Sequence, residues 1–262
     1  MKYTLLFLLL FTTIINAQTK DVSLLLPWKH QFQFAGYYVA QELGFYKDAG
    51  LNVHIVEYDL KKDNTKDVAN QKYDFGVGHS SLILDKLNTY PNIMLLSAIH
   101  QSSPLILLAK KRLDLVSLKD IANKTIMMSR DQTTTASINA MLSAEHLEID
   151  SYKIVDTSFQ PLDLINGKAD LMASYSSNEP YVLDKVGIKY TIFDPKDYGY
   201  DFYSDILFTS TNLIKEDPKT VNNFYRATMH GWAYAYQHID EAIDIIYKKY
   251  NTQNRTKEAL QF

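Results

Sequence analysis

The stretch PWKHQFQFAGYYVAQELGFYKDAG, residues Pro27–Gly50, carries most of the information about the fold. It follows the short apolar run Val22–Leu26, which is typical of a buried strand. A helical pattern then begins at Ala35-Gly36 and continues to Tyr46. In open α/β sheets, ligands bind beyond the carboxyl ends of the strands, where helix N-terminal amides can also hold an anionic group. We therefore expect this stretch to form one wall of a ligand cleft.

Three further segments share this order of strand, polar loop and helix start: Tyr73–Ser80, Thr125–Thr135 and Ala169–Glu179. The alternation predicts an α/β fold. The hydroxyl groups at these helix starts can cap free backbone N–H groups. They can equally bind a ligand oxygen or phosphate, and both interpretations stay open at this stage.

Several segments of the chain resemble the opening of one known family. They are Leu26–Trp28, then QFAGYYVA (Gln33–Ala40), GFYK (Gly44–Lys47) and GLNV (Gly50–Val53). This order is similar to that of periplasmic binding proteins for thiamine pyrimidine precursors, whose relatives bind nitrate, sulfonate and taurine. The resemblance implies an α/β, two-lobed periplasmic binding protein fold, type II-like, with a cleft and a hinge between the lobes.

The resemblance also divides the chain. Lobe 1 is expected to comprise residues 20–100 plus 205–262, and lobe 2 residues 105–200. Two crossings, near Ser97–Pro104 and Tyr198–Asp205, would form the hinge, and the lobes would close over a ligand.

Residues 1–17 have the features of a signal peptide. Lys2 precedes the apolar run Leu5–Phe11, and a small residue, Ala17, ends a plausible cleavage site. A transmembrane anchor is the alternative, but the apolar run is short for a spanning helix. We therefore expect export to the periplasm with cleavage of this segment.

Composition excludes several classes of function. The net charge of −3 gives no basic field for nucleic acid. The chain has no Cys, so disulfides, thiolate metal sites and a cysteine nucleophile are excluded. The seven His form no HExxH or HxH motif, and the chain lacks GxGxxG, GxxxxGK[ST] and GxSxG. We accordingly expect no catalytic residue, no metal, no cofactor and no enzymatic activity.

Candidate ligand-binding residues come from the polar loops, the hinge and the aromatic stretch. Trp28, Phe34 and Tyr37 would stack on a flat ring. By the resemblance, the phrase Asn178-Glu179-Pro180 places a carboxylate where the family reads the amino group of an aminopyrimidine, a charge-assisted contact; the alternative is that Glu179 simply favours the first turn of a helix. The full predicted set is Trp28, Gln33, Phe34, Tyr37, Gly78, His79, Ser80, Arg130, Thr133, Thr134, Thr135, Asn178, Glu179, Tyr203 and Asp205.

The resemblance implies a monomeric binding protein that captures a thiamine pyrimidine precursor or a similar small heterocycle for an ABC permease. A small anion such as a sulfonate is an alternative ligand, in which case helix N-termini and Arg130 would dominate, and an arginine reaching into the cleft would favour it. A second alternative is the input domain of a membrane-bound histidine kinase or diguanylate cyclase, whose partner would be a signalling domain. A third is an enzyme of pyrimidine synthesis, which would need a lysine for pyridoxal phosphate and a metal site.

Overall fold

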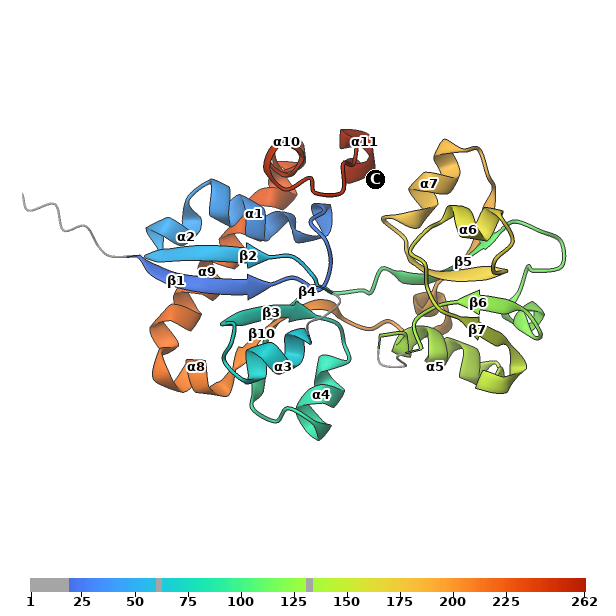
Figure 1. Ribbon diagram of the computed structural model, residues 1–262, viewed down its shortest axis with the longest axis horizontal. Coiled ribbons are helices and arrows are strands. Elements are labelled where there is room, and N and C mark those ends of the chain that lie inside the picture. The colour runs from blue at the N-terminus through green and yellow to red at the C-terminus, as the bar shows by residue number, and fades with distance from the viewer. Residues whose placement is uncertain (1–18, 60–62, 131–133) are drawn as a thin grey trace, which may run out of the picture.

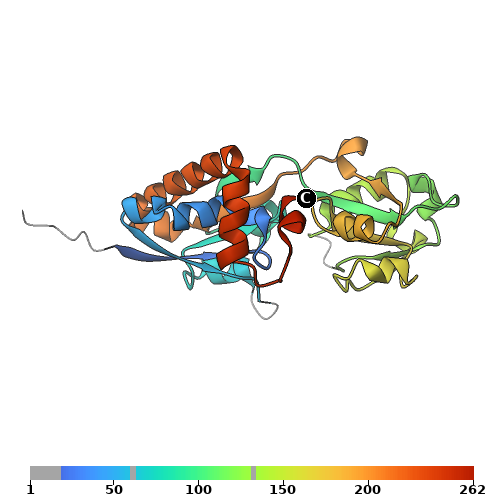
Figure 2. The same cartoon turned by 90° about the horizontal axis from the view of Figure 1, so that it is seen from above.

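The computed structural model describes residues 19–59, 63–130 and 134–262. Two five-stranded sheets, each covered by helices, form two lobes that lie side by side (Figure 1), and the view from above shows the same separation (Figure 2). The predicted α/β, two-lobed fold is therefore confirmed. The predicted signal peptide, residues 1–17, and the candidate Thr133 lie outside the described residues.

The sheet of the first lobe has the strand order β2-β1-β3-β10-β4. Its strands are β1 (Lys20–Leu25), β2 (Leu51–Val56), β3 (Phe75–Gly78), β4 (Ile93–His100) and β10 (Ser204–Ser210). β1 pairs in parallel with β2 and β3, whereas β10 runs antiparallel between β3 and β4. Every residue of β10 is buried, as expected for a strand covered on both faces.

The helices of the first lobe come from both ends of the chain. They are α1 (Ala35–Glu42), α2 (Phe45–Asp48), α3 (Asn64–Ala69), α4 (Leu82–Asn88), α8 (Thr211–Glu216), α9 (Pro218–Gln237), α10 (Ile239–Lys249) and α11 (Lys257–Gln261), with the 3-10 turn η1 (Phe32–Phe34) before α1. The predicted helix to Tyr46 is interrupted at Gly44, whose φ of +81° separates α1 from α2. Such an angle suits glycine, which has no Cβ.

The longest helix, α9, begins at Pro218, directly after the capping residue Asp217. The Asp217 carboxylate accepts a hydrogen bond from the Thr220 N–H at 3.0 Å, and Pro218 occupies the first turn. Its buried face packs on α1, and Gly231 lies where the two helices meet. A β-carbon at Gly231 would overlap Gly36 O and lie 2.7 Å from Ala40 Cβ, so this crossing requires glycine. Trp232 is buried here, in the core of the first lobe.

The sheet of the second lobe has the order β7-β6-β8-β5-β9. Its strands are β5 (Leu105–Lys110), β6 (Thr125–Met127), β7 (Lys153–Val155), β8 (Leu171–Tyr175) and β9 (Tyr190–Phe193). Its helices are α5 (Ala136–Ala144), α6 (Leu162–Ile165) and α7 (Glu179–Lys185), with 3-10 turns η2 (Leu118–Ile121), η3 (Ile149–Ser151) and η4 (Pro195–Tyr198). β8 ends at Tyr175, and α7 begins four residues later with Glu179.

The chain passes between the sheets twice, through residues 101–104 after β4 and residues 194–203 before β10. A hydrogen bond of 2.6 Å from Ser102 Oγ to Asp201 Oδ1 joins these two connections. We propose lobe boundaries at residues 20–100 plus 205–262 and at 105–200, because each set of residues contributes the strands of one sheet. Within the described residues, no helix has the length and apolar character needed to cross a membrane.

Candidate functional site

A chain of polar side chains joins the two lobes. Arg255 Nη1 donates to Asn178 Oδ1 at 2.7 Å, and Asn178 Nδ2 donates to Gln31 Oε1 at 3.4 Å. Gln31 Nε2 then donates to Gln33 Oε1, and Gln33 Nε2 donates to both carboxylate oxygens of Asp205 at 2.8 Å. We call these five residues the amide chain. Its bonds all run in one direction, because a guanidinium only donates and an ionised carboxylate only accepts.

The amide chain draws on four segments that are distant in sequence. Gln31 and Gln33 lie at η1, the first element after β1, and Asp205 is the second residue of β10. Asn178 precedes α7 of the second lobe, and Arg255 lies between α10 and α11. Asp205 has a φ of +48°, a left-handed conformation that Asp tolerates better than most residues. The site is thus assembled where the lobes and one of their connections meet.

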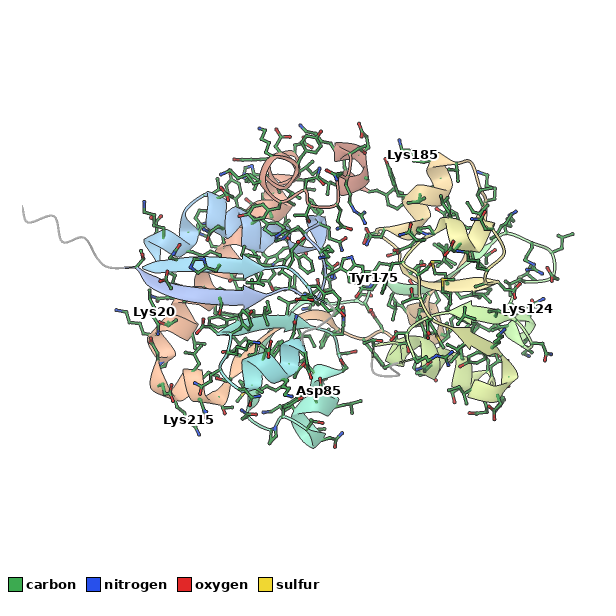
Figure 3. The ribbon with its side chains drawn as sticks, in the orientation of Figure 1. Lys20, Asp85, Lys124, Tyr175, Lys185 and Lys215 are labelled. Carbon is green, nitrogen blue, oxygen red and sulfur yellow. The ribbon has the colours of Figure 1, made fainter. Side chains whose placement is uncertain are left out.

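A second group of polar residues surrounds Asp205. His100 Nδ1 lies 3.9 Å from Asp205 Oδ2, and the Tyr175 hydroxyl lies 3.3 Å from His79 Nδ1, which links the lobes again. Tyr175 is labelled in Figure 3, at the junction of the lobes. Burial raises the pKa of the Asp205 carboxyl above its usual value, although His100, His79 and the bond from Gln33 oppose that shift. Burial likewise raises the pKa of the Tyr175 phenol.

Glu179 is half-buried at the first turn of α7. The Tyr175 N–H donates to its Oε2 at 2.7 Å. Burial raises the pKa of the Glu179 carboxyl, while that backbone bond and the positive charge of Arg255 lower it. A carboxylate has about four lone-pair positions, so Glu179 retains acceptor capacity for an N–H group of a ligand.

Aromatic side chains also meet where the lobes come together. The Trp28 ring stacks on Tyr58 with a centroid distance of 5.7 Å and an interplanar angle of 24°. Phe159, from the second lobe, lies 4.6 Å away from the Trp28 ring, tilted by 54°. Trp28 therefore takes part in an aromatic contact between the lobes, and its role at a ligand wall stays a prediction.

The other two predicted stacking residues do not reach this surface. Phe34 and Tyr37 are each 0% exposed and belong to the core of the first lobe. The Tyr37 ring packs edge-on against Trp232 at 5.7 Å, because the helical period of α1 turns this residue toward α9. The expectation that these two rings stack on a ligand therefore disagrees with the structure.

The candidates from the second lobe's first loop also lie elsewhere. Arg130 is exposed and pairs with Asp156, with Nε 2.7 Å from Oδ1. Thr135 is buried, and its Oγ1 accepts a bond from Asn139 Nδ2 at 3.1 Å. Both residues line a pocket of about 420 Å³ that also includes Tyr152. The contacts of the described residues therefore do not connect Arg130 or Thr135 to the amide chain.

The remaining candidates are less informative. Thr134, Gly78 and Ser80 are half-buried, and the Ser80 carbonyl accepts a hydrogen bond from the Ile83 N–H at 3.1 Å. The Tyr203 side chain is 54% exposed and lies on the connection before β10. None of these observations assigns a ligand contact to them, so their roles remain predictions.

Sequence reasoning missed Gln31, Tyr175 and Arg255. Gln31 lies in the quoted stretch, and its spacing of two from Gln33 was the available signal. Arg255 carries no such signal, because only tertiary contacts bring the polar residues after α10 to the second lobe. Within the described ranges, no cluster of three or more His, Cys, Asp or Glu residues has the arrangement of a metal site.

Comparison with known proteins places this geometry in context. The model of the family described as NMT1/THI5 like matches residues 31–242. The riboflavin-binding protein RibY of Chloroflexus aurantiacus is 26% identical over 239 residues, which cover 88% of this chain and 67% of that protein. A formylaminopyrimidine-binding protein of Halalkalibacterium halodurans is 24% identical, over 87% of this chain and 70% of that protein.

A further relative and a solved structure extend the comparison. A protein of Legionella pneumophila named 4-amino-5-hydroxymethyl-2-methylpyrimidine phosphate synthase is 26% identical, over 86% of this chain and 72% of its own length. The crystal structure of a putative periplasmic sulfonate-binding protein SsuA from Methylobacillus flagellatus superposes with a TM-score of 0.70. It is 17% identical and is matched over 93% of this chain and 77% of that chain, so the similarity is one of fold.

Proposed function

Because the chain belongs to the NMT1/THI5-like family, we propose that it is an extracytoplasmic solute-binding protein that captures a small heterocycle between its lobes. The ligand we propose is of the class of thiamine pyrimidine precursors, delivered to an ABC permease. The observation that carries the proposal is Glu179, a half-buried carboxylate that begins α7. It follows Asn178 of the amide chain directly, and the charge of Arg255, the partner of Asn178, acts on it.

The chemistry of the site suits a ring that both donates and accepts hydrogen bonds. Glu179 accepts from an exocyclic amino group, and such a bond to a charged acceptor is stronger than a neutral one. The Gln31 amide has a second N–H besides the one that it donates to Gln33, and such a donor suits a ring nitrogen, which accepts. Trp28 supplies an aromatic face, and the names of the riboflavin-binding and formylaminopyrimidine-binding relatives support a heterocyclic ligand.

A small anion is the second candidate ligand, and Arg255 is the observation that favours it. Its guanidinium reaches the second lobe, and the matched fold includes a putative sulfonate-binding protein. However, Glu179 and Asp205 lie in the same assembly, so two carboxylates oppose one guanidinium. We therefore rank the heterocycle above the anion.

We propose binding without catalysis, since two relatives are named as binding proteins, although a third is named as a synthase. We also propose export to the periplasm through residues 1–17 and a monomeric state. A sensory input domain remains the alternative to uptake. Stimulation of ATP hydrolysis by a reconstituted permease, with ligand present, would support uptake; a reading frame that continues into a transmembrane signalling protein would support sensing.

Titration of the purified protein tests the ligand class. The ligands are the hydroxymethyl and formylamino pyrimidine precursors, thiamine, taurine and nitrate. Intrinsic tryptophan fluorescence and calorimetry measure the binding of each. The chain has two tryptophans, so Trp28→Phe identifies which one reports, because Trp232 lies in the core. We expect saturable binding of a pyrimidine. Binding of taurine or nitrate alone would overturn the heterocycle and retain the fold.

A further inference from the structure

The residues after α10 lie on the first lobe and contact the second. We call Asn251–Phe262 the clasp. Besides the bond from Arg255 to Asn178, the Thr256 Oγ1 lies 3.3 Å from the Tyr181 hydroxyl, and the Phe262 ring lies 5.4 Å from the Tyr181 ring. Asn178 and Tyr181 flank Glu179 on either side in the sequence, so the clasp meets the second lobe at the start of α7.

The clasp is held firmly on the first lobe. Thr252 Oγ1 donates to Glu57 Oε1 at 2.5 Å, and Gln253 Nε2 donates to the His30 carbonyl at 2.8 Å. Leu260 is buried in the core of the first lobe. These contacts make the clasp part of the first lobe rather than a loose connection.

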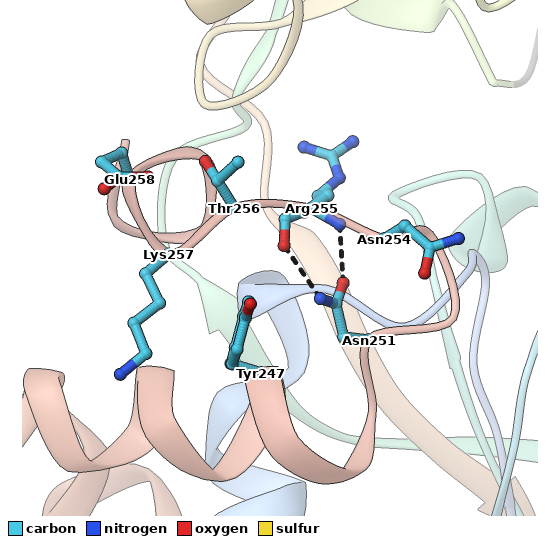
Figure 4. A pocket seen from close by; sticks show the side chains of 7 residues that line it. All are labelled: Tyr247, Asn251, Asn254, Arg255, Thr256, Lys257 and Glu258. Atoms are coloured by element: carbon cyan, nitrogen blue, oxygen red, sulfur yellow. Dashed lines mark hydrogen bonds between the residues drawn. The ribbon is translucent and has the colours of Figure 1, made fainter.

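The backbone around Arg255 is also fixed. The Asn251 side chain donates to the Arg255 carbonyl and accepts from the Arg255 N–H, both at 2.8 Å (Figure 4). Figure 4 shows the guanidinium pointing away from the helix that carries Tyr247. Among the residues that the structure describes, one of its five N–H donors has an acceptor, Asn178 Oδ1. The Arg255 side chain therefore points to the second lobe, and its other N–H donors can bond to further acceptors.

We propose that Arg255 is a positioning residue for ligand recognition: the clasp brings its guanidinium to the start of α7, where it orients Asn178 and places a positive charge at the residue that precedes Glu179. This inference rests on the proposed role of Glu179 in binding. Its consequence is that the Glu179 acceptor of the second lobe depends on the positive charge of Arg255 of the first lobe. Recognition and the approach of the lobes are therefore coupled.

The electrostatics of the two residues agree with this arrangement. Burial lowers the pKa of the Arg255 guanidinium and raises that of the Glu179 carboxyl, and the charge of each partner opposes the shift of the other. The charged or titratable groups that face Glu179 are Arg255 and the Tyr175 phenol, which in turn contacts His79 and senses Asp205. Among these charged or titratable groups near Glu179, Arg255 is the one that the clasp contributes, and it is a cation.

The first test is the pH profile of binding for the hydroxymethyl pyrimidine precursor, measured by calorimetry with wild type, Arg255→Met, Arg255→Lys and Arg226→Met. Without Arg255, Glu179 becomes neutral at a higher pH, so the loss of affinity in Arg255→Met grows as the pH falls. We expect the loss to reach about tenfold at the acidic end of the profile, because an opposite charge shifts a neighbouring carboxyl pKa by about 1–3 units. The ligand and its own titration are the same in every experiment, so a difference between the pH profiles of two variants arises from the protein.

The control variants separate charge from packing. Arg226 is an exposed arginine of α9, and Arg226→Met should leave the profile unchanged. Arg255→Lys keeps the positive charge but not the planar fork, so it should recover part of the affinity. An Arg255→Met variant whose loss is the same at every pH would show a merely structural role and overturn the proposal.

A second measurement needs no ligand. In protein labelled with ¹³C-carboxyl glutamate, the Glu179 signal is identified by its loss in Glu179→Gln, and its titration is followed in wild type and Arg255→Met. We expect its midpoint to rise by about one pH unit or more in Arg255→Met. Equal midpoints would overturn the role of Arg255. If wild type binds no pyrimidine, the proposed function fails, and this titration still decides whether Arg255 controls the charge of Glu179.

Discussion

Glu179 combines burial, a backbone donor and a neighbouring cation, and this combination decides what the site can recognise. The carboxylate accepts from the Tyr175 N–H and lies near Arg255. A ligand that covers the remaining acceptor positions of Glu179 removes water from them, so a ligand that supplies an N–H or O–H group binds at a lower cost in free energy. This requirement separates an aminopyrimidine from nitrate or from a sulfonate without an amino group, which carry acceptors alone.

Glu179→Gln tests that requirement. The amide keeps the size of the side chain but loses the charge and gains donors, so an amino group on the ligand loses its charge-assisted partner. We expect calorimetry to show weaker binding of the pyrimidine by about 1.5–3 kcal/mol, the contribution of a hydrogen bond to a charged group. Tighter binding of taurine or nitrate by the same variant would instead favour the anion.

Trp28 is the second residue whose role can be measured directly. Trp28→Ala removes the ring that lies between Tyr58 and Phe159, and we expect binding of an aromatic ligand to weaken by about 1–3 kcal/mol. Trp28→Phe retains a stacking face and serves as the matched control. Affinity unchanged in Trp28→Ala would remove this residue from the site.

At the scale of elements, α1 shows how far the sequence predicts the site. The apolar run before it and the helical pattern within it predict β1 and α1, but not which side of α1 faces the ligand. Phe34 and Tyr37 are buried because the close crossing with α9, some 190 residues later in the sequence, covers that side. A partner so distant in sequence leaves no local pattern, and the same reason hides the contribution of Arg255.

Gly231→Ala tests this crossing. A methyl group there would overlap Gly36 O, so α1 and α9 must separate. We expect the free energy of unfolding to fall by about 1–3 kcal/mol, the usual cost of overpacking. Urea unfolding measures it, with the midpoint lowered and the slope unchanged. The exposed Asn222 of α9 provides the control, since Asn222→Ala should change stability by less than about 0.5 kcal/mol. Equal stability of Gly231→Ala and wild type would mean that the crossing tolerates a β-carbon.

For the whole molecule, two kinds of contact hold the lobes together: the two chain connections, and the side-chain contacts that include the amide chain. The connections, joined by the bond between Ser102 and Asp201, form a narrow bridge between two separately packed cores. Across the remaining junction, side-chain hydrogen bonds and a few ring contacts predominate. Local apolar runs predicted the alternation of strands and helices, and the resemblance to the family implied the two lobes. Neither could predict the contacts across the junction, which depend on how the lobes pack together.

Because the lobes are joined by a narrow bridge and a few side-chain contacts, we predict that they close when a ligand binds. A ligand that contacts Glu179 on one lobe and Gln33 on the other gains from both only when the lobes approach, so it shifts the population toward the closed form. We expect small-angle X-ray scattering to give a smaller radius of gyration with saturating hydroxymethyl pyrimidine than without it. The Glu179→Gln variant, given the same ligand concentration, should contract less because fewer of its molecules are occupied. A radius of gyration that stays constant while calorimetry reports saturation would mean that the ligand binds lobes already in their final arrangement, and the bridge would then be a spacer rather than a hinge.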